Sequence, residues 1–233
     1  MKKVFIVANW KSNKTINEAK LWLNEAKRFS IPEGKEIIIC PPFILLSEMH
    51  SIIKNENLSI KLGAQNISSF SQGAYTGEIS TKQAAGLATY AIIGHSDRRK
   101  YFHETNDDVI AKLKQLIEGD IAPILCVSDL KQMDYYLSKD SIIKDKASDI
   151  IFVYEPPNAI SENGKYHPEN PETANQNAGQ ISQKIGKKVI TLYGGSINSN
   201  NVRSFFTLDN IDGGLIGQAS LDPLEFLQII KNA

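Results

Sequence analysis

Asp-Ile-Ile-Phe-Val-Tyr-Glu-Pro-Pro-Asn-Ala-Ile-Ser-Glu-Asn-Gly-Lys, residues 149–165, places the carboxylate of Glu155 between a short apolar run and a polar loop. The apolar residues 150–154 are β-branched or aromatic, which is typical of a strand buried on both faces. Pro156 and Pro157 cannot continue that strand, because proline has no backbone N–H to donate. We therefore expect Glu155 at the C-terminal end of a strand, facing a loop that acts as a lid.

The same order of apolar run, polar turn and helix repeats along the chain. Apolar runs occupy residues 4–8, 36–40, 59–64, 89–94, 121–127, 150–154, 188–193 and 211–216. Helical spacing follows them at residues 15–29, 43–54, 80–87, 106–118, 130–147, 171–185 and 224–230, with a capping box at Thr15 and a short helix capped by Asn198. Eight such units without a linker favour an α/β fold in which residues 1–233 form a single closed (β/α)8 barrel, rather than an open doubly wound sheet.

The overall composition is that of an ordinary globular protein. The 233 residues are 42% hydrophobic and 22% charged, and 26 basic residues balance 26 acidic ones, so nothing indicates a nucleic-acid or membrane partner. Cys40 and Cys126 end apolar runs instead of forming a disulfide or metal framework. The first apolar run is too short for an export signal or a membrane span. These features predict a reduced, cytoplasmic protein.

Polar residues and glycines directly follow the apolar runs. In a barrel of this kind the loops after the strands share one rim, and active sites form there. The residues at this predicted rim are Asn9, Lys11, His95, Glu155, Gly194, Gly195, Ser196, Gly217 and Gln218. Glycine-rich turns expose backbone N–H groups that bind phosphate, so the turns after the seventh and eighth runs predict a small phosphorylated substrate. The alternative is that Gly194 and Gly195 form only a tight turn.

The side-chain types at the rim fit one kind of reaction. A carboxylate such as Glu155 removes a proton from carbon, while an imidazole and an ammonium stabilise the negative oxygen that results. His95 and Lys11 supply these two groups, so the sequence predicts proton abstraction next to a carbonyl. The alternatives are an exposed strand-end acid at 155 and a core histidine at 95. We expect the remaining candidates to be structural or to form surface ion pairs: His50, His103, His167, Arg98 and Arg99.

Segments across nearly the whole chain resemble the motifs of the triosephosphate isomerase family, in the family's order: Asn9-Trp10-Lys11, Ile93-Gly94-His95-Ser96-Asp97-Arg98-Arg99, Tyr154-Glu155-Pro156, Tyr193-Gly194-Gly195-Ser196 and Gly214-Leu215-Ile216-Gly217-Gln218-Ala219-Ser220-Leu221. The resemblance implies a TIM barrel that interconverts dihydroxyacetone phosphate and D-glyceraldehyde 3-phosphate in glycolysis, gluconeogenesis and the pentose phosphate pathway. It implies that Glu155 moves a proton between C1 and C2 through an enediol or enediolate, and that a neutral His95 acts on the substrate oxygens. Lys11 would stabilise charge and Asn9 would orient the substrate. No metal or organic cofactor is implied.

The resemblance also implies contacts for the phosphate and for a second subunit. Phosphate contacts are implied for Gly194, Gly195, Ser196, Gly217, Gln218 and, in the lid segment (residues 156–165), Ser161. Family members are typically homodimers in which one long loop enters the neighbouring subunit. The stretch from Gln65 to Glu78 resembles that loop, and Thr76 in it would reach the site of the partner subunit.

Several features depart from the family pattern. They are Asp97 in place of glutamate, Gln218 in place of the second glycine of the eighth turn, Pro157 in the first hinge of the lid segment, Asn158 in place of an aromatic anchor, and Ser161 in place of a glycine whose N–H meets the phosphate. The lid segment is also one residue longer, and the fifth unit, residues 130–148, is shorter. We expect Asp97 to help position Lys11, with a side chain one methylene shorter than glutamate. We expect Gln218 to occupy the turn although glutamine disfavours positive φ.

Two other functions stay open from the sequence alone. A different phosphosugar isomerase or an aldolase can use the same barrel, since a fold does not fix its function, and an aldolase would form a Schiff base on Lys11. A non-catalytic sugar-phosphate binder would keep the phosphate turns without turnover. Intact Glu155 and His95 favour the isomerase over both.

Overall fold

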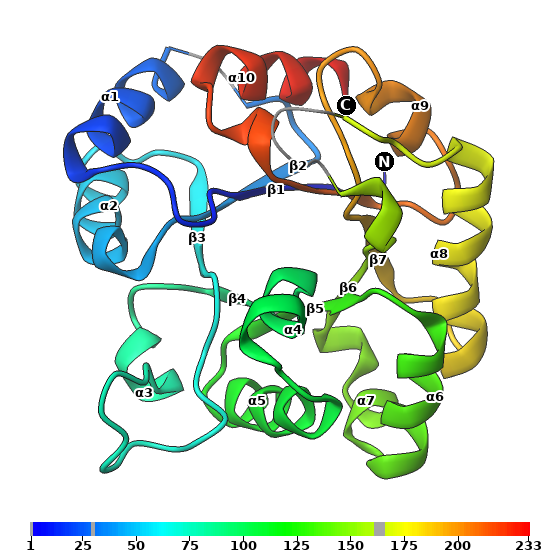
Figure 1. Cartoon of the computed structure of the whole chain (residues 1–233). Coiled ribbons are helices and arrows are strands. Elements are labelled where there is room, and N and C mark those ends of the chain that lie inside the picture. The colour runs from blue at the N-terminus through cyan, green and yellow to red at the C-terminus, as the bar shows by residue number, and fades with distance from the viewer. Residues whose placement is uncertain (1, 29–30, 161–165) are drawn as a thin grey trace.

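Eight parallel strands close into one barrel (Figure 1). The computed structural model describes residues 2–28, 31–160 and 166–233. The strands follow the order of the chain, and the eighth pairs with the first. They are β1 (Val4–Asn9), β2 (Lys35–Cys40), β3 (Ile60–Ala64), β4 (Tyr90–Ile93), β5 (Ala122–Val127), β6 (Ile151–Tyr154), β7 (Ile190–Tyr193) and β8 (Gly213–Ile216). The predicted (β/α)8 barrel is therefore confirmed.

Helices cover the outside of the barrel (Figure 1). The described helices are α1 (Ile16–Ala26), α2 (Phe43–Asn55), α3 (Thr81–Ala84), α4 (Ser96–Phe102), α5 (Asn106–Glu118), α6 (Leu130–Lys139), α7 (Ile142–Asp145), α8 (Pro171–Ile185), α9 (Val202–Phe206) and α10 (Pro223–Asn232). The predicted capping box at the start of α1 is confirmed, because the side chains of Thr15 and Glu18 each accept a hydrogen bond from the other's backbone N–H.

Four parts of the helical layer differ from the prediction. Asn198 does not cap α9, because the N-cap residue is Asn201 and no side chain caps this helix. Helix α4 was missed because none of its residues is buried, so its sequence carries no apolar period. The helix expected over residues 80–87 ends at Ala84, since Ala85 is extended and Gly86 has φ +84°. The helix expected over residues 130–147 breaks at Asp140, whose extended backbone ends α6 and whose carboxylate accepts a hydrogen bond from the N–H of Ile142 in α7.

Side chains alternate along each strand between two apolar layers. In β1, Phe5 and Val7 belong to a cluster inside the barrel, while Ile6 and Ala8 pack with the residues beneath the helices. The inner cluster comprises Phe5, Val7, Ile38, Cys40, Ile92, Ile124, Cys126, Ile151, Val153, Leu192 and Leu215. Because interiors of this kind are close-packed, the strand ends above the cluster form a rigid base for side chains at the rim.

The cysteines belong to this inner layer. Cys40 and Cys126 are both free and buried, and burial raises the pKa of each thiol. A thiol with a raised pKa forms little thiolate, so neither side chain is suited to nucleophilic chemistry. In the part of the chain that the structure describes, no helix has the length and apolar character to cross a bilayer.

Candidate active site

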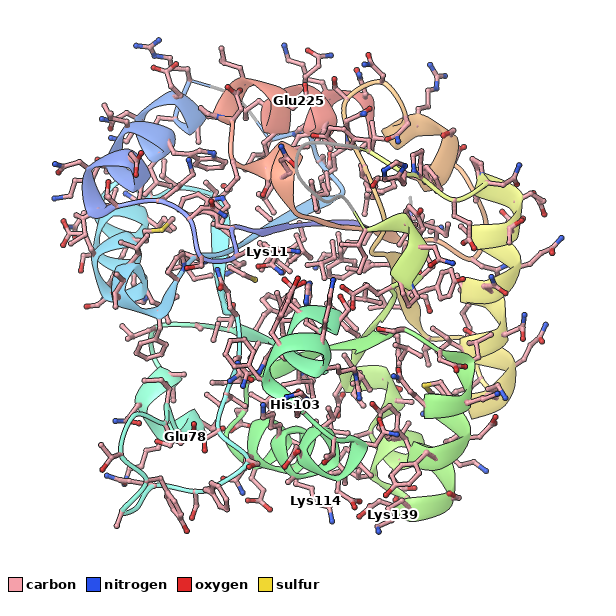
Figure 2. All side chains as sticks on the ribbon, in the orientation of Figure 1. Lys11, Glu78, His103, Lys114, Lys139 and Glu225 are labelled. Atoms are coloured by element: carbon pink, nitrogen blue, oxygen red, sulfur yellow. The ribbon has the colours of Figure 1, made fainter. Side chains whose placement is uncertain are left out.

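The C-terminal ends of the strands surround a hollow of about 430 Å³ that opens to solvent. It is bordered by Asn9, Lys11, His95, Glu155, Gly194, Gly195, Gly217 and Gln218, so these predicted rim residues lie together, and by four apolar or aromatic neighbours. Figure 2 shows Lys11 near the middle of the ring of strands, whereas Lys114, Lys139 and Glu225 lie on the outer helices. Across the described residues, no group of three His, Cys, Asp or Glu side chains is placed to hold a metal ion.

His95 lies between the end of β4 and the start of α4. Its Nδ1 accepts a hydrogen bond from the backbone N–H of Asp97 at 3.0 Å. A ring nitrogen that accepts a hydrogen bond carries no proton, so the imidazole is neutral and its proton is on Nε2. That Nε2 lies 3.1 Å from Oε1 of Glu155, and both side chains are buried. The first turn of α4 therefore sets the tautomer that faces the hollow.

Glu155 follows β6 directly and is only 1% exposed. Its Oε2 accepts a hydrogen bond from the backbone N–H of Ser96 at 2.9 Å, and its Oε1 accepts one from the Ser96 hydroxyl at 2.8 Å. The carboxylate is therefore held against the first residue of α4. The sequence prediction assigned no role to Ser96, although it directly follows His95 in the quoted motif.

Lys11 adopts a backbone conformation that is rare for lysine, with φ +49°. The Asn9 side chain stabilises this turn by accepting the Lys11 N–H at 3.1 Å, and Gln65 donates its amide to the carbonyl oxygens of Lys11 and Cys40. The Nζ atom of Lys11 lies 2.9 Å from Oδ2 of Asp97. Asp97 thus reaches Lys11 even though aspartate is a methylene shorter than glutamate.

Two glycine turns border the hollow beside these side chains. A Cβ on Gly195 would lie 2.1 Å from the Tyr193 hydroxyl oxygen, so only glycine fits there. Gly217 combines φ −85° with ψ −106°, outside the main regions allowed to other residues. Gln218 is absent from the described non-glycine residues with positive φ, so glutamine at this position introduces no backbone strain. Its exposed side-chain amide has no hydrogen-bond partner among the described residues.

Ser196 differs from the other predicted phosphate residues because it does not border the hollow. It is 1% exposed, and both its N–H and its hydroxyl donate to the carbonyl oxygen of Ala159 at 2.8 Å. The same hydroxyl oxygen accepts the N–H of His167 at 3.0 Å. Ser196 therefore ties together the backbone on either side of residues 161–165. Ser161 itself lies outside the described residues.

Thr76 lies on the long loop between β3 and α3. Residues 70–78 of the loop are exposed, and the rings of Phe70 and Tyr75 stack on each other with centroids 4.4 Å apart. A second groove, of about 1970 Å³, runs from Asn9, Lys11 and His95 towards Glu78. Thr76 borders neither this groove nor the hollow of its own chain.

The other candidates fall outside the hollow. Arg98 forms the expected ion pair, since its Nε donates to Glu104 at 2.6 Å. Arg99 instead donates to the carbonyl oxygen of Gly94, to Asn106 and to Tyr136. His50 hydrogen-bonds the Leu87 carbonyl oxygen, and His103 and His167 are exposed, as a structural or surface placement requires.

Glu169 follows the lid segment, and its contribution to folding stability depends on pH. Its Oε1 accepts a hydrogen bond from the Tyr154 hydroxyl at 3.3 Å, but its Oε2 is buried without a partner among the described residues. Burial raises the pKa of Glu169. Because the folded-state pKa is raised, the ionised carboxylate lowers stability above that pKa, and the effect disappears as the pH falls through it.

We expect Glu169→Gln to raise the unfolding midpoint at pH 8 by about 1 °C, a small value because partial exposure screens the charge. The gain should shrink at pH 4. Thermal unfolding at both pH values measures it, with the exposed Glu172→Gln on α8 as a control for charge removal. A lower midpoint for Glu169→Gln at pH 8 would contradict the prediction.

Comparison with known proteins places this site in a family. The sequence profile of the family described as Triosephosphate isomerase matches residues 4–233. The chain is 38% identical over an alignment of 254 positions to the triosephosphate isomerase of Dictyoglomus turgidum, with both chains covered completely. It is 34% identical over 251 residues to that of Thermus thermophilus, again with complete coverage, and 38% identical over 251 residues to that of Dehalococcoides mccartyi, covering 100% of this chain and 97% of the relative. The chain belongs to the triosephosphate isomerase family.

Proposed function

We propose that this protein interconverts dihydroxyacetone phosphate and D-glyceraldehyde 3-phosphate through an enediol or enediolate. Family membership makes the chain an isomerase of the intramolecular oxidoreductase class. The observation that carries the specific proposal is the 3.1 Å approach of His95 Nε2 to Glu155 Oε1, in the same hollow as Lys11. A carboxylate, a neutral N–H donor and an ammonium are the groups that proton removal next to a carbonyl requires.

Glu155 is the proposed base. It takes the proton from C1 of dihydroxyacetone phosphate and returns it to C2, so that one carboxylate serves both directions of the reaction. In the structure this carboxylate accepts two hydrogen bonds from Ser96. To reach a substrate carbon, Glu155 must exchange these contacts for the substrate.

His95 and Lys11 are the proposed groups for the oxygen atoms. The Nε2–H of His95 donates to the oxygens on C1 and C2, where negative charge develops as the proton leaves. Lys11 adds a positive charge at the same edge of the hollow, and Asp97 positions that charge through the 2.9 Å ion pair. Asn9 sets the Lys11 turn through its Oδ1 and orients the substrate from the floor of the site.

The phosphate is proposed to bind at the turns after β7 and β8, beside Lys11, since a Cβ on Gly217 would lie 3.7 Å from Cε of Lys11. The N–H of Gly194 already donates to the carbonyl oxygen of Tyr154 at 2.8 Å, so the proposed donors are the backbone N–H groups of Gly195, Gly217 and Gln218. Neutral donors of this kind suit a phosphate dianion. Ser196 supports the site from below through the backbone of Ala159 and His167. Ser161 is proposed as the contact from the lid segment on the family resemblance alone.

A coupled assay with purified protein tests the function. We expect turnover of glyceraldehyde 3-phosphate and of dihydroxyacetone phosphate without added metal or cofactor. Binding of either substrate without turnover would instead identify a sugar-phosphate binder. Covalent trapping by borohydride in the presence of substrate would identify an aldolase-type Schiff base, which the ion pair of Lys11 Nζ with Asp97 disfavours.

The proposal includes a homodimer that completes the site. Large apolar side chains are exposed on the loop from Gln65 to Glu78 (Phe70, 49%; Tyr75, 43%), on α4 (Tyr101, 62%; Phe102, 66%) and at the start of α2 (Ile44, 80%). Tyr101 and Phe102 border the groove that leads to Lys11 and His95. Apolar surface beside an open groove is typical of a protein–protein contact. The partner's Thr76 would occupy the groove, on the loop from Gln65 to Glu78.

Charging this loop should therefore separate the subunits and weaken activity. We expect Thr76→Glu to sediment as a monomer at micromolar concentration and to lose at least about tenfold in kcat, because misplacement of active-site groups is costly. Thr76→Ser, which keeps the hydroxyl, is the matched control. A dilute wild-type monomer with full activity would contradict the dimer proposal.

The proposed reaction would place the protein in glycolysis, gluconeogenesis and the pentose phosphate pathway. A cytoplasmic location is proposed with it. The two free cysteines suit a reducing compartment. Immunodetection in fractionated cells measures the location, and recovery of the protein outside the cytoplasmic fraction would contradict it.

A further inference from the structure

The residue before His95 is held in a conformation that only glycine adopts easily. Gly94 has φ +69°, and a Cβ at this position would lie 3.1 Å from both Arg99 Nη2 and the Cys126 carbonyl oxygen. Glycine has little intrinsic preference for one orientation of its peptide groups. The orientation of the Gly94–His95 peptide, and with it the direction of the imidazole, must therefore be fixed by other residues.

Two charged side chains hold Gly94 from opposite sides. The carbonyl oxygen of Gly94 accepts a hydrogen bond from Nε of Arg99 at 2.9 Å. Its N–H donates to Oε1 of Glu104 at 3.2 Å. The carbonyl group of Gly94 and the N–H of His95 form one peptide group. Arg99, which binds this carbonyl oxygen, is therefore the side chain that limits rotation of that peptide group.

Arg99 is itself held by α5 and α6. Its Nη1 donates to Oδ1 of Asn106 at 2.9 Å, and its Nη2 donates to the hydroxyl of Tyr136 at 2.5 Å. The Tyr136 hydroxyl donates in turn to Asn106 at 3.4 Å. Tyr136 is fully buried, and burial raises its pKa to about 12, so it is a neutral phenol at physiological pH. Each of the three guanidinium nitrogens thus has a defined acceptor.

We propose that Tyr136 is a positioning residue for His95, acting through Arg99 and the carbonyl oxygen of Gly94. Tyr136 does not border the hollow, so it cannot touch a substrate there. Tyr136 lies on α6, in the shortened fifth unit, and through it this helix contacts Arg99, which holds the peptide before the His95 imidazole. The inference rests on the proposed isomerase function, because that function is what requires the orientation of Nε2.

The test compares Tyr136→Phe with Tyr135→Phe. Phenylalanine keeps the packing of the ring and removes only the hydroxyl. Tyr135→Phe also removes one hydroxyl hydrogen bond, an exposed one of 2.9 Å to Asp107, which has no connection to Gly94. The measurements are the ¹⁵N resonances of the His95 imidazole in histidine-labelled protein, kcat and KM with triose phosphate, and the unfolding midpoint. Arg99→Lys, which lacks the planar fork, is a second variant of the same support.

For Tyr136→Phe we expect displaced His95 resonances and a kcat about tenfold lower, with KM changed less than about twofold, as for a misplaced catalytic group. Tyr135→Phe should keep the wild-type resonances and kcat. Identical His95 resonances and kcat in the two variants would overturn the proposal. Absence of turnover in the wild type would refute the proposed function instead, and the resonances would still decide whether Tyr136 positions His95.

Discussion

Replacement of Glu155 by glutamine is expected to lower kcat by about 10³-fold, within the range for a positioned general base. Glutamine has the size of glutamate and still accepts the Ser96 N–H through its carbonyl oxygen, so packing at this buried position is kept. An amide cannot take a proton from carbon, which removes the chemical step. KM should change little, because the proposed phosphate contacts come from the turns after β7 and β8. Steady-state kinetics in the coupled assay measures both constants.

The matched control is Glu172→Gln. Glu172 is an exposed acid in the first turn of α8, so this variant removes one negative charge away from the hollow. It should keep the wild-type kcat. Turnover by Glu155→Gln within tenfold of wild type would exclude Glu155 as the base.

Replacement of Glu104 by glutamine is expected to lower the free energy of unfolding by about 3 kcal/mol, the loss typical of a broken buried ion pair. The side chains of Glu104 and Lys112 are only 3% and 6% exposed and form an ion pair. Glu104 also accepts the Nε–H of Arg98 at 2.6 Å. Without the carboxylate, the buried Lys112 ammonium keeps Oδ1 of Asn66 as a partner but no negative charge. Urea unfolding measures the loss.

Two controls separate burial from charge. Glu25→Gln removes the acid of an exposed pair, whose Arg28 side chain is 72% exposed, and should change stability by less than about 1 kcal/mol. Adding Lys112→Met to Glu104→Gln removes the unpaired ammonium and should restore part of the loss. A loss for Glu104→Gln no larger than that for Glu25→Gln would contradict the prediction.

The same pair gives a pH dependence. Burial alone would raise the pKa of Glu104, but the hydrogen bonds and charges of Lys112 and Arg98 outweigh it and hold the pKa below its ordinary value. A carboxylate with a lowered folded-state pKa adds stability above its unfolded-state pKa, and this stability is lost as the pH falls through the folded-state value. The difference between wild type and Glu104→Gln should therefore be constant near neutrality and narrow below about pH 4.

The strands could be predicted because burial on both faces makes each one a continuous apolar run, as in β6 at Ile151–Tyr154. Helix α1 could be predicted because Thr15 and Glu18 mark its start. Helix α4 could not, since it buries no side chain and is held instead by polar contacts to residues distant in the chain. The end of α3 at Ala84 likewise could not be predicted, because it depends on backbone angles that the spacing of residues 80–87 does not indicate.

The placement of Lys11, His95 and Glu155 around one hollow follows from a simple rule, because parallel strands put the residues after them on one rim. The hydrogen-bond partners of serine hydroxyl groups follow no such rule. Ser96 holds Glu155, and Ser196 joins Ala159 to His167, through contacts that exist only once separate loops have met. Serine is common in loops, so neither role has a sequence signal of its own.

The hydrogen bonds between Ser96 and Glu155 have a consequence for ligand affinity. In the conformation described, the Glu155 carboxylate is hydrogen-bonded to Ser96. Only the fraction of free molecules in which these hydrogen bonds are broken can act on a substrate carbon. The apparent dissociation constant is then the intrinsic dissociation constant divided by that fraction, so it is larger. A ligand that needs Glu155 must therefore offset the loss of its hydrogen bonds to Ser96. A compound that fills only the phosphate turns leaves these hydrogen bonds in place, whereas a compound with a carbonyl beside His95 requires Glu155 to release Ser96.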